Sequence, residues 1–193
     1  MNLLKIALGT LILTSTLFSK EYIVNKDNSN AQFQIKYQKS NIIDGTFKDL
    51  SGKIDFDELS NNIKSLKGEI EIDSIQTLNE SLEELIKSDK ILDNKKFPKI
   101  TFTATKIEEN KIFGDLKIKD VTRNIEFELQ NNGVFLDTLY LTLTTNIKRS
   151  FFDLSWDELL DTGSSATSNE IQIQINIEAN LLDKFYFKDK KAK

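Results

Sequence analysis

The chain of 193 residues contains no cysteine and no histidine. Without cysteine it can form no disulfide, no thiolate nucleophile and no thiolate metal site. Without histidine it lacks the usual general base near neutral pH and the commonest metal ligand of proteins. Most hydrolase and metalloenzyme classes are therefore excluded, and the sequence predicts neither catalytic nor metal-ligating residues.

The mildly acidic charge balance also argues against a nucleic-acid partner. The net charge is −4, and Arg123 and Arg149 are the two arginines of the chain. Phosphate contacts need clustered cations, so we expect no nucleic-acid binding. The last residues, 188–193, form a short basic tail. Its simplest interpretation is a solvated end, and a weak contact with an anionic membrane is the alternative.

Long hydrophobic runs are missing except at the N-terminus. Lys5 precedes an almost wholly apolar stretch, Ile6–Leu17, and Ser19 follows it. This arrangement predicts a cleaved signal peptide over residues 1–19, with a buried N-terminal helix as the alternative. The run is too short to cross a bilayer comfortably, so no stable membrane span is expected. Residues 20–193 would then form one domain in a periplasmic or secreted protein.

Alternation of apolar and polar residues dominates the rest of the chain, and it predicts eight or nine strands. The clearest run has Ile171, Ile173, Ile175, Ile177 and Ala179 on one face, against Gln172, Gln174, Asn176, Glu178 and Asn180. Strands with one apolar and one polar face form antiparallel sheets that are wet on one side. Because an open sheet of this size exposes its edges, we expect a closed barrel or a two-sheet sandwich, with the apolar faces inward.

One segment follows a helical pattern instead. From Thr77 to Leu92 the apolar residues recur at helical spacing, and Pro98 stops any helix beyond. Thr77 and Glu80 have the spacing of a capping box. The sequence therefore predicts one amphipathic helix that packs over an end or against the wall of the barrel.

Several local motifs, in order, resemble the YceI-like family of periplasmic lipid-binding proteins. The resemblance runs from Tyr22 to Ala179 and rests on six segments at matching spacing. They are Gly45–Phe47 with Gly52–Phe56, Asp73–Thr77, Ser88–Asp89, Phe97–Phe102, Gly114–Arg123 and Ile147–Phe152. The chain departs from the family pattern at Leu85–Ile86, Ile91–Leu92, Asp120 and Asp153, and in a segment around Trp156.

The resemblance implies an all-β, antiparallel, lipocalin-like barrel of about eight strands with an extended apolar pore. Relatives bind polyisoprenoid chains such as prenyl quinones or prenyl phosphates, and some pair as dimers, so a homodimer is one expected state. We therefore expect no catalysis and no cofactor other than a bound isoprenoid lipid. The expected pore residues are Phe33, Ile35, Phe47, Phe56, Ile72, Leu85, Phe102, Ala104, Phe127, Leu141, Ile173 and Ile175. The expected head-group or mouth residues are Ser88, Asp89, Arg123 and Arg149.

Two other functions stay open at this point. A barrel whose interior is filled by its own side chains would be a ligand-free scaffold or a protein-interaction module. A carboxylate-based hydrolase is less favoured, although Asp153, Asp157 and Asp161 lie at helical spacing and could instead form a weak calcium site or a solvated face.

Export can be tested on the purified protein. We expect the exported protein to lack residues 1–19, because Lys5, the apolar stretch and Ser19 have the order of a cleaved leader. Intact-mass measurement on protein from the periplasm or medium reads the first residue directly. Retention of Met1–Phe18 would contradict export with cleavage.

Overall fold

The computed structural model describes residues 19–37, 41–154 and 167–182, and most of them are in strands. The strands are β1 (Lys20–Val24), β2 (Asn30–Tyr37), β3 (Asn41–Phe47), β4 (Leu50–Asp57), β5 (Asn62–Glu71), β6 (Ile75–Gln76), β7 (Lys99–Ile107), β8 (Lys111–Ile118), β9 (Val121–Phe135), β10 (Thr138–Lys148) and β11 (Thr167–Leu181). The described part has one α-helix, α1 (Glu80–Lys87), and two 3-10 turns, η1 (Ile72–Ser74) and η2 (Arg149–Phe152). The predicted all-β class with one helix is confirmed.

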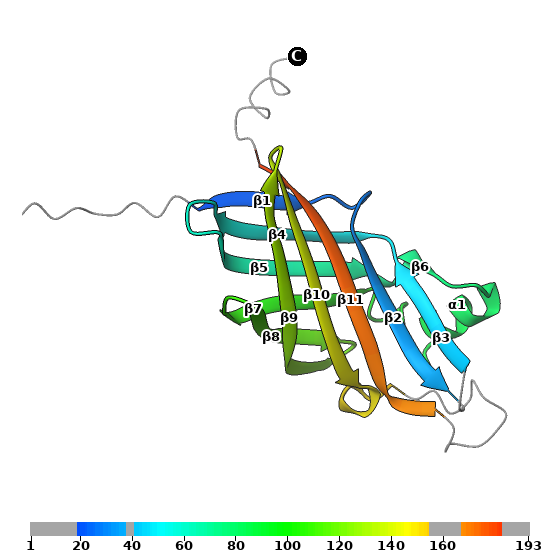
Figure 1. Ribbon diagram of the computed structural model, residues 1–193. Coiled ribbons are helices and arrows are strands. Elements are labelled where there is room, and N and C mark those ends of the chain that lie inside the picture. The colour runs from blue at the N-terminus through cyan, green and yellow to red at the C-terminus, as the bar shows by residue number, and fades with distance from the viewer. Residues whose placement is uncertain (1–18, 38–40, 155–166, 183–193) are drawn as a thin grey trace, which may run out of the picture.

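Eight of these strands close into an antiparallel barrel. Their order is β1-β4-β5-β7-β8-β9-β10-β11, and β1 pairs back onto β11. The remaining strands β2, β3 and β6 extend the sheet from the other half of β11, where Ile171–Asn176 pair with β2. In Figure 1 the strands β1, β4 and β5 run across β9, β10 and β11 at a steep angle, as expected of a strongly coiled sheet. Because β1 starts at Lys20, the barrel closes without residues 1–19.

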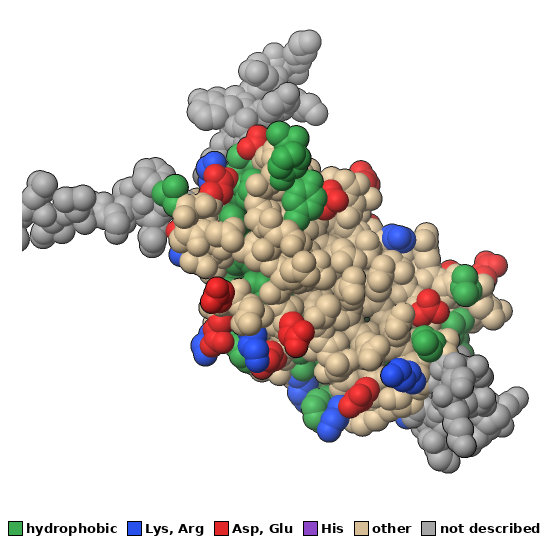
Figure 2. All heavy atoms as spheres, viewed as in Figure 1, with side chains coloured by type: hydrophobic (Ala, Val, Ile, Leu, Met, Phe, Trp, Pro, Cys, Tyr) green, Lys and Arg blue, Asp and Glu red, His purple; other side chains and the backbone are tan. Residues whose placement is uncertain are grey.

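The sequence alternation becomes an apolar interior. In β8 every second residue from Ile112 to Ile118 is buried, and in β10 the same holds for Leu139, Leu141 and Leu143. The intervening residues reach the outer surface, which is largely polar and uncharged over β10, β11 and β2 (Figure 2). The prediction that the apolar faces point inward is therefore confirmed.

The two ends of the barrel differ. At the end that we call the turn end lie the β4–β5, β7–β8 and β9–β10 turns, together with the start of β1 and the end of β11. At the other end, the helix end, lie α1 and η2 (Figure 1). Strand pairing also stops early at two places. β5 and β7 pair only between residues 67–71 and 99–103, and β9 and β10 separate beyond the Thr144–Glu128 pair.

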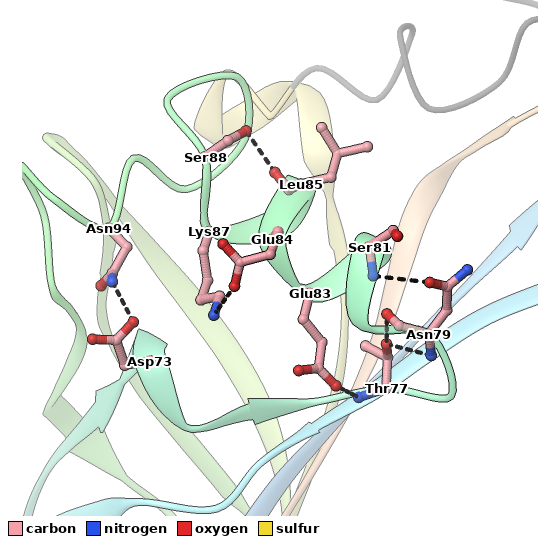
Figure 3. A network of polar contacts seen from close by, with 10 residues as sticks. All are labelled: Asp73, Thr77, Asn79, Ser81, Glu83, Glu84, Leu85, Lys87, Ser88 and Asn94. Carbon is pink, nitrogen blue, oxygen red and sulfur yellow. Dashed lines mark hydrogen bonds and ion pairs between the residues drawn. The ribbon is translucent and has the colours of Figure 1, made fainter.

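The helix is shorter than predicted, and its expected capping box is wrong by two residues. α1 begins after Asn79, whose side-chain oxygen accepts a hydrogen bond from the backbone N–H of Ser81 at 2.9 Å. The Asn79 N–H donates to the Thr77 hydroxyl oxygen at 3.1 Å, and the Thr77 N–H donates to the Glu83 carboxylate at 2.7 Å (Figure 3). Pairing of β6 with β3 holds Ile75 and Gln76 extended, so Thr77 is still leaving the sheet and cannot cap a helix.

The C-terminal half of the predicted helix is not helical. α1 ends at Lys87, and the Ser88 hydroxyl donates to the Leu85 carbonyl at 2.6 Å. Turns follow up to Phe97, and Asp93 has a positive φ of 50°. These turns place Ile91 and Leu92 in the buried core at the helix end. Burial of these two side chains, which a continued helix would direct elsewhere, favours the turns over the helix.

Two glycines that face each other across β4 and β5 provide a matched stability test. A methyl group at Gly52 would lie 2.5 Å from the backbone oxygen of Lys67, whereas one at Gly68 would meet no atom nearer than 3.7 Å. We expect Gly52→Ala to destabilise the protein by about 1–3 kcal/mol through overpacking. Gly68→Ala should leave stability equal or slightly higher, because alanine restricts the unfolded chain. Urea denaturation midpoints measure both, and equal midpoints would contradict the expectation.

Candidate functional site

The inner wall of the barrel carries two clusters of buried apolar residues, one toward each end. Between them lies a belt of inward-facing residues that contacts both clusters and is only partly buried. The belt consists of Val24, Phe102, Ile125, Ile173 and Ile175. Residues in the middle of a solidly packed core are fully buried, so the partial exposure of this belt marks incomplete filling of the barrel at mid-height.

Two apolar cavities account for this incomplete filling. The central cavity, of about 60 Å³, lies at mid-barrel and is lined by inward side chains and one glycine: Val24, Leu50, Ile54, Leu66, Gly68, Ile70, Ile100, Phe102, Leu116, Phe127, Leu143, Ile175 and Ile177. The helix-end cavity, of about 70 Å³, is lined by Phe33, Phe47, Ile86, Ile91, Leu92, Ile100, Ile118, Ile147, Leu154, Ile171 and Ile173. Ile100 borders both cavities. Because they share Ile100, the two cavities adjoin, and we call them together the apolar path.

Inward-facing glycines determine where space remains on this path. The Phe33 ring occupies the place of a side chain at Gly45, and the Phe102 ring does the same at Gly114. Phe102 also packs edge to face on Phe127, with ring centroids 5.1 Å apart. Gly68 has no such ring above it and faces the central cavity. The cavity therefore exists partly because one wall position has no side chain.

The helix end of the path is covered by α1 and the turns after it. Ile86, Ile91 and Leu92 from this segment line the helix-end cavity. Polar bonds hold the segment to the sheet, as Figure 3 shows: Thr77 donates to Glu83, and the Asn94 amide donates to Asp73 at 2.6 Å. We call residues 80–98 the cover. It buries Ile86, Ile91 and Leu92 in the core, and a few polar contacts also bind it to the barrel.

The structure brings half of the predicted pore residues to the two cavities. Phe102, Phe127 and Ile175 line the central cavity, and Phe33, Phe47 and Ile173 line the helix-end cavity. Of the others, Ile35, Ile72, Phe56 and Leu141 are buried in the surrounding core, and Leu85 packs against it from α1. Ala104 is partly buried where β5 and β7 separate, and it lines an outer depression together with Ile107 and Leu129.

Sequence reasoning left out several residues that line the cavities. Gly68, Ile54, Ile70 and Ile100 already stood on the apolar faces of predicted strands, so alternation alone could have included them. No sequence signal identified Ile91 and Leu92 as part of the wall, because their inward position depends on the turns after α1.

The four predicted head-group residues do not form one site, because Ser88 and Asp89 follow α1 whereas Arg123 lies on β9 and Arg149 in η2. Ser88 ends α1, and Asp89 is exposed beside it. The Arg123 guanidinium is exposed and donates to the Thr122 carbonyl at 3.0 Å. The Arg149 guanidinium donates to the carbonyls of Ser168 and Leu154 at 3.2 and 3.3 Å, and thereby ties η2 to β11. Within the described residues, these four do not border either apolar cavity.

The turn end of the barrel is closed by a buried tyrosine. Tyr22 is fully buried, packs edge to face on Phe56, and donates its hydroxyl to the Glu58 carboxylate. Lys20 binds the same carboxylate at 2.8 Å. Burial, and then the bond to Glu58, raise the pKa of Tyr22 above its ordinary value. The bonds from Lys20 and Tyr22 lower the pKa of Glu58.

No group of three acidic side chains that could hold a metal ion occurs among the described residues. Asp153 has a positive φ of 51° after η2, while Asp157, Asp161 and Trp156 lie outside the described residues, as does the basic tail. In the described ranges, no helix combines the length and the apolarity that crossing a bilayer requires.

The fold and the site define a closed antiparallel barrel with an apolar interior and a helical cover at one end. The model of the YceI-like domain family matches residues 22–179. The chain therefore belongs to the YceI-like family, as the motifs indicated.

Solved structures agree with this membership. The Campylobacter jejuni YCEI protein is 33% identical, with a TM-score of 0.64 over 74% of this chain and 86% of that one. A polyisoprenoid binding domain from Saccharophagus degradans, implicated in plant cell wall breakdown, shares the fold at 13% identity, with a TM-score of 0.68 over 83% of this chain and 98% of that one. A UPF0312 protein of Staphylococcus aureus (strain N315) is 29% identical over 92 residues, 45% of this chain. The match spans about half, 54%, of that relative's length.

The Tyr22–Glu58–Lys20 contact predicts a pH-dependent contribution to stability. Because the pKa of Glu58 is lowered in the folded protein, its stabilising effect is present above the unfolded pKa of about 4.3 and is lost as the pH falls through the folded value. Glu58→Gln should therefore lower the denaturation midpoint at pH 7 and lower it less near pH 3. A deficit that is equally large at both values would show that packing, and not charge, matters at this position.

Proposed function

We propose that this protein is a non-catalytic carrier that holds the hydrocarbon chain of an isoprenoid lipid inside the barrel. The observation that supports this most directly is the apolar path formed by the central and helix-end cavities. Ser51, Lys67, Glu69 and Thr101 border the central cavity only from alternate, outward-facing positions. A long apolar ligand needs such continuous apolar walls and few polar anchors.

The energetics suit a prenyl chain. Each isoprene unit removed from water contributes roughly 2–3 kcal/mol, at about 25 cal/mol per Å² of apolar surface. Several sheltered units can therefore give tight binding without a charged anchor inside the barrel. The polyisoprenoid-binding description of the Saccharophagus degradans neighbour supports the same ligand class.

The cavities are smaller than such a ligand. They measure about 60 and 70 Å³, whereas pockets that hold drug-sized ligands measure roughly 300–1,000 Å³. Ligand uptake therefore requires that the partly buried belt changes rotamers or that the cover moves. Movement of residues 80–98 would break the hydrogen bonds to Thr77 and Asp73 and would withdraw Ile86, Ile91 and Leu92 from the core.

The proposal also covers the head group of the lipid. A prenyl quinone or prenyl phosphate would leave its polar head outside the apolar path, because charged side chains do not point into the two cavities from the described strands. The proposal includes a periplasmic or secreted location, which the leader-like residues 1–19 support.

A ligand-free scaffold is the second candidate, and the small size of the cavities favours it. In that function the barrel interior would be a nearly solid core, and the outer surface would bind a partner. The two functions differ in what a larger side chain at the cavity would do.

Gly68 offers that test. We expect Gly68→Leu to fold with a denaturation midpoint close to that of the wild type, since a side chain there points into the central cavity. The same change should greatly reduce the prenyl lipid that mass spectrometry detects in an organic extract of the purified protein. Thr103→Leu is the matched control, because Thr103 is exposed on the outer face of β7.

Two results would overturn the carrier function. One is a lipid-free extract from well-folded wild-type protein. The other is a Gly68→Leu protein that retains wild-type lipid, or that loses stability by the roughly 1–3 kcal/mol expected of an overpacked solid core. The control must retain its lipid, since a loss in both variants would point to a general folding defect and would also count against the cavity as the binding site.

A further inference from the structure

A wide depression on the barrel wall lies where β5 and β7 separate. The pairing of these two strands ends at Lys67–Thr103, although β5 continues beside β4 and β7 continues beside β8. In Figure 1 the β7–β8 turn lies apart from the β4–β5 turn at the same end of the barrel. The depression has a volume of about 710 Å³, which is within the range of roughly 300–1,000 Å³ for ligand pockets, unlike the two inner cavities.

Core residues form the floor of this depression. Ile63 and Leu129 line it, and both belong to the buried cluster toward the turn end. Leu129 stands on β9, whose partners are β8 and β10, and it lies opposite the inward-facing Leu143. Ala104 and Ile107, from β7, also line the depression and pack against the same cluster. The depression therefore reaches the apolar interior from the side.

The depression and the central cavity adjoin on both strands. On β5, Ser65 lines the depression and Leu66 lines the central cavity. On β7, Ala104 lines the depression and Phe102 lines the central cavity. The ring of Phe102, which packs on Phe127, therefore stands between the two spaces. Because Phe102 is only partly buried, its displacement costs less packing than that of a residue in a solid core.

The charges around the depression are balanced. Lys64, on β5, pairs with Asp57 at 3.5 Å, and Lys106, on β7, pairs with Glu108 at 2.5 Å. Glu109 lines the depression beside Glu108. A phosphate in the depression would meet these two carboxylates next to lysines that are already paired. The surroundings therefore favour an uncharged head group.

We propose that the isoprenoid chain enters the barrel from the side, between β5 and β7, and that an uncharged head group, a quinone or an alcohol, stays in this depression. The amide of Asn62, which lines the depression, provides a donor for a carbonyl or hydroxyl oxygen. The inference rests on the proposed carrier function and adds to it the route of the lipid and the chemistry of its head group.

Side entry requires less rearrangement than entry at the helix end. Moving the cover breaks its bonds to Thr77 and Asp73 and withdraws three buried side chains, Ile86, Ile91 and Leu92, from the core. Side entry displaces Phe102 and leaves the β5–β7 ladder intact, because that ladder ends where the depression begins.

Cross-linking distinguishes the two routes, because the chain has no cysteine of its own. In one variant, Lys64→Cys with Lys106→Cys, a flexible bismaleimide bridges the depression. In the matched control, Asp73→Cys with Asn94→Cys, the same reagent bridges the contact that holds the cover. Intact mass verifies both bridges, and rapid gel filtration follows uptake of tritiated geranylgeraniol, an uncharged prenyl alcohol. We expect the first bridge to slow uptake by about tenfold and the second to leave it unchanged.

A second pair of variants needs no cross-link. Ala104→Trp places a large side chain in the depression beside Phe102, so it should slow uptake as the first bridge does. Thr103→Trp is the control, because Thr103 is exposed on the outer face of β7. Urea denaturation midpoints of both variants should stay close to that of the wild type, since neither position is fully buried.

The head group has its own test. Geranylgeranyl phosphate should bind about tenfold more weakly than geranylgeraniol, because the depression carries no uncompensated positive charge within the described residues. Glu108→Gln with Glu109→Gln should reduce this difference. A phosphate that binds the wild type as tightly as the alcohol does would contradict the uncharged head group.

The outcomes also distinguish the route from the carrier function. Uptake that only the cover bridge slows, or that both bridges slow equally, would overturn side entry and leave the carrier function standing. Uptake that neither the first bridge nor Ala104→Trp slows would do the same. No uptake by the wild type, or uptake that Gly68→Leu leaves unchanged, would overturn the carrier function itself, and side entry with it.

Discussion

The architecture depends on how β11 is shared between two partners. Its C-terminal part pairs with β1 through Tyr22, Ile23 and Val24, and this short ladder closes the barrel. Its middle part pairs with β2, which carries β3 and β6 outward from the barrel. One edge of a strand can pair with only one neighbour at each residue. β1 and β2 therefore occupy successive stretches of the same edge of β11, residues 179–181 and 171–176. The same division creates the helix end, where α1 and η2 cover the core that the barrel strands leave uncovered.

The closed barrel contains space because Gly68 leaves one inward position of its wall without a side chain. Eight strands enclose a volume that side chains can fill or that can hold a small ligand. Phe33 and Phe102 use the room above two inward glycines, while Gly68 leaves its room unused. Whether an aromatic ring covers each inward glycine therefore decides whether that part of the interior is filled or empty. The proposed carrier function depends on this empty space.

The two ends of the barrel are held by different contacts. The helix end has an apolar inner surface and is held by hydrogen bonds such as Thr77–Glu83 and Asn94–Asp73. The turn end is fixed by the buried Tyr22 and its bond to Glu58, and it carries apolar side chains that point away from the core.

The sequence by itself determined the strands, their inward faces and the family. Alternation depends only on neighbouring residues, so Ile112–Ile118 and Leu139–Leu143 could be assigned to the core before any pairing was known. It also located six residues that line the cavities, including Phe33 and Phe102. Tertiary structure alone decided the rest. The helix cap is Asn79 and not Thr77, because β6 pairs with β3. Ile91 and Leu92 lie in turns after the helix, where their side chains are buried. Ala104 does not line the cavities, because the pairing of β7 with β5 ends at Thr103. Closure of the barrel also brings the β4–β5 turn next to β9, where Asn131 binds Asn61. Such outcomes depend on contacts between residues far apart in the chain, which local patterns do not encode.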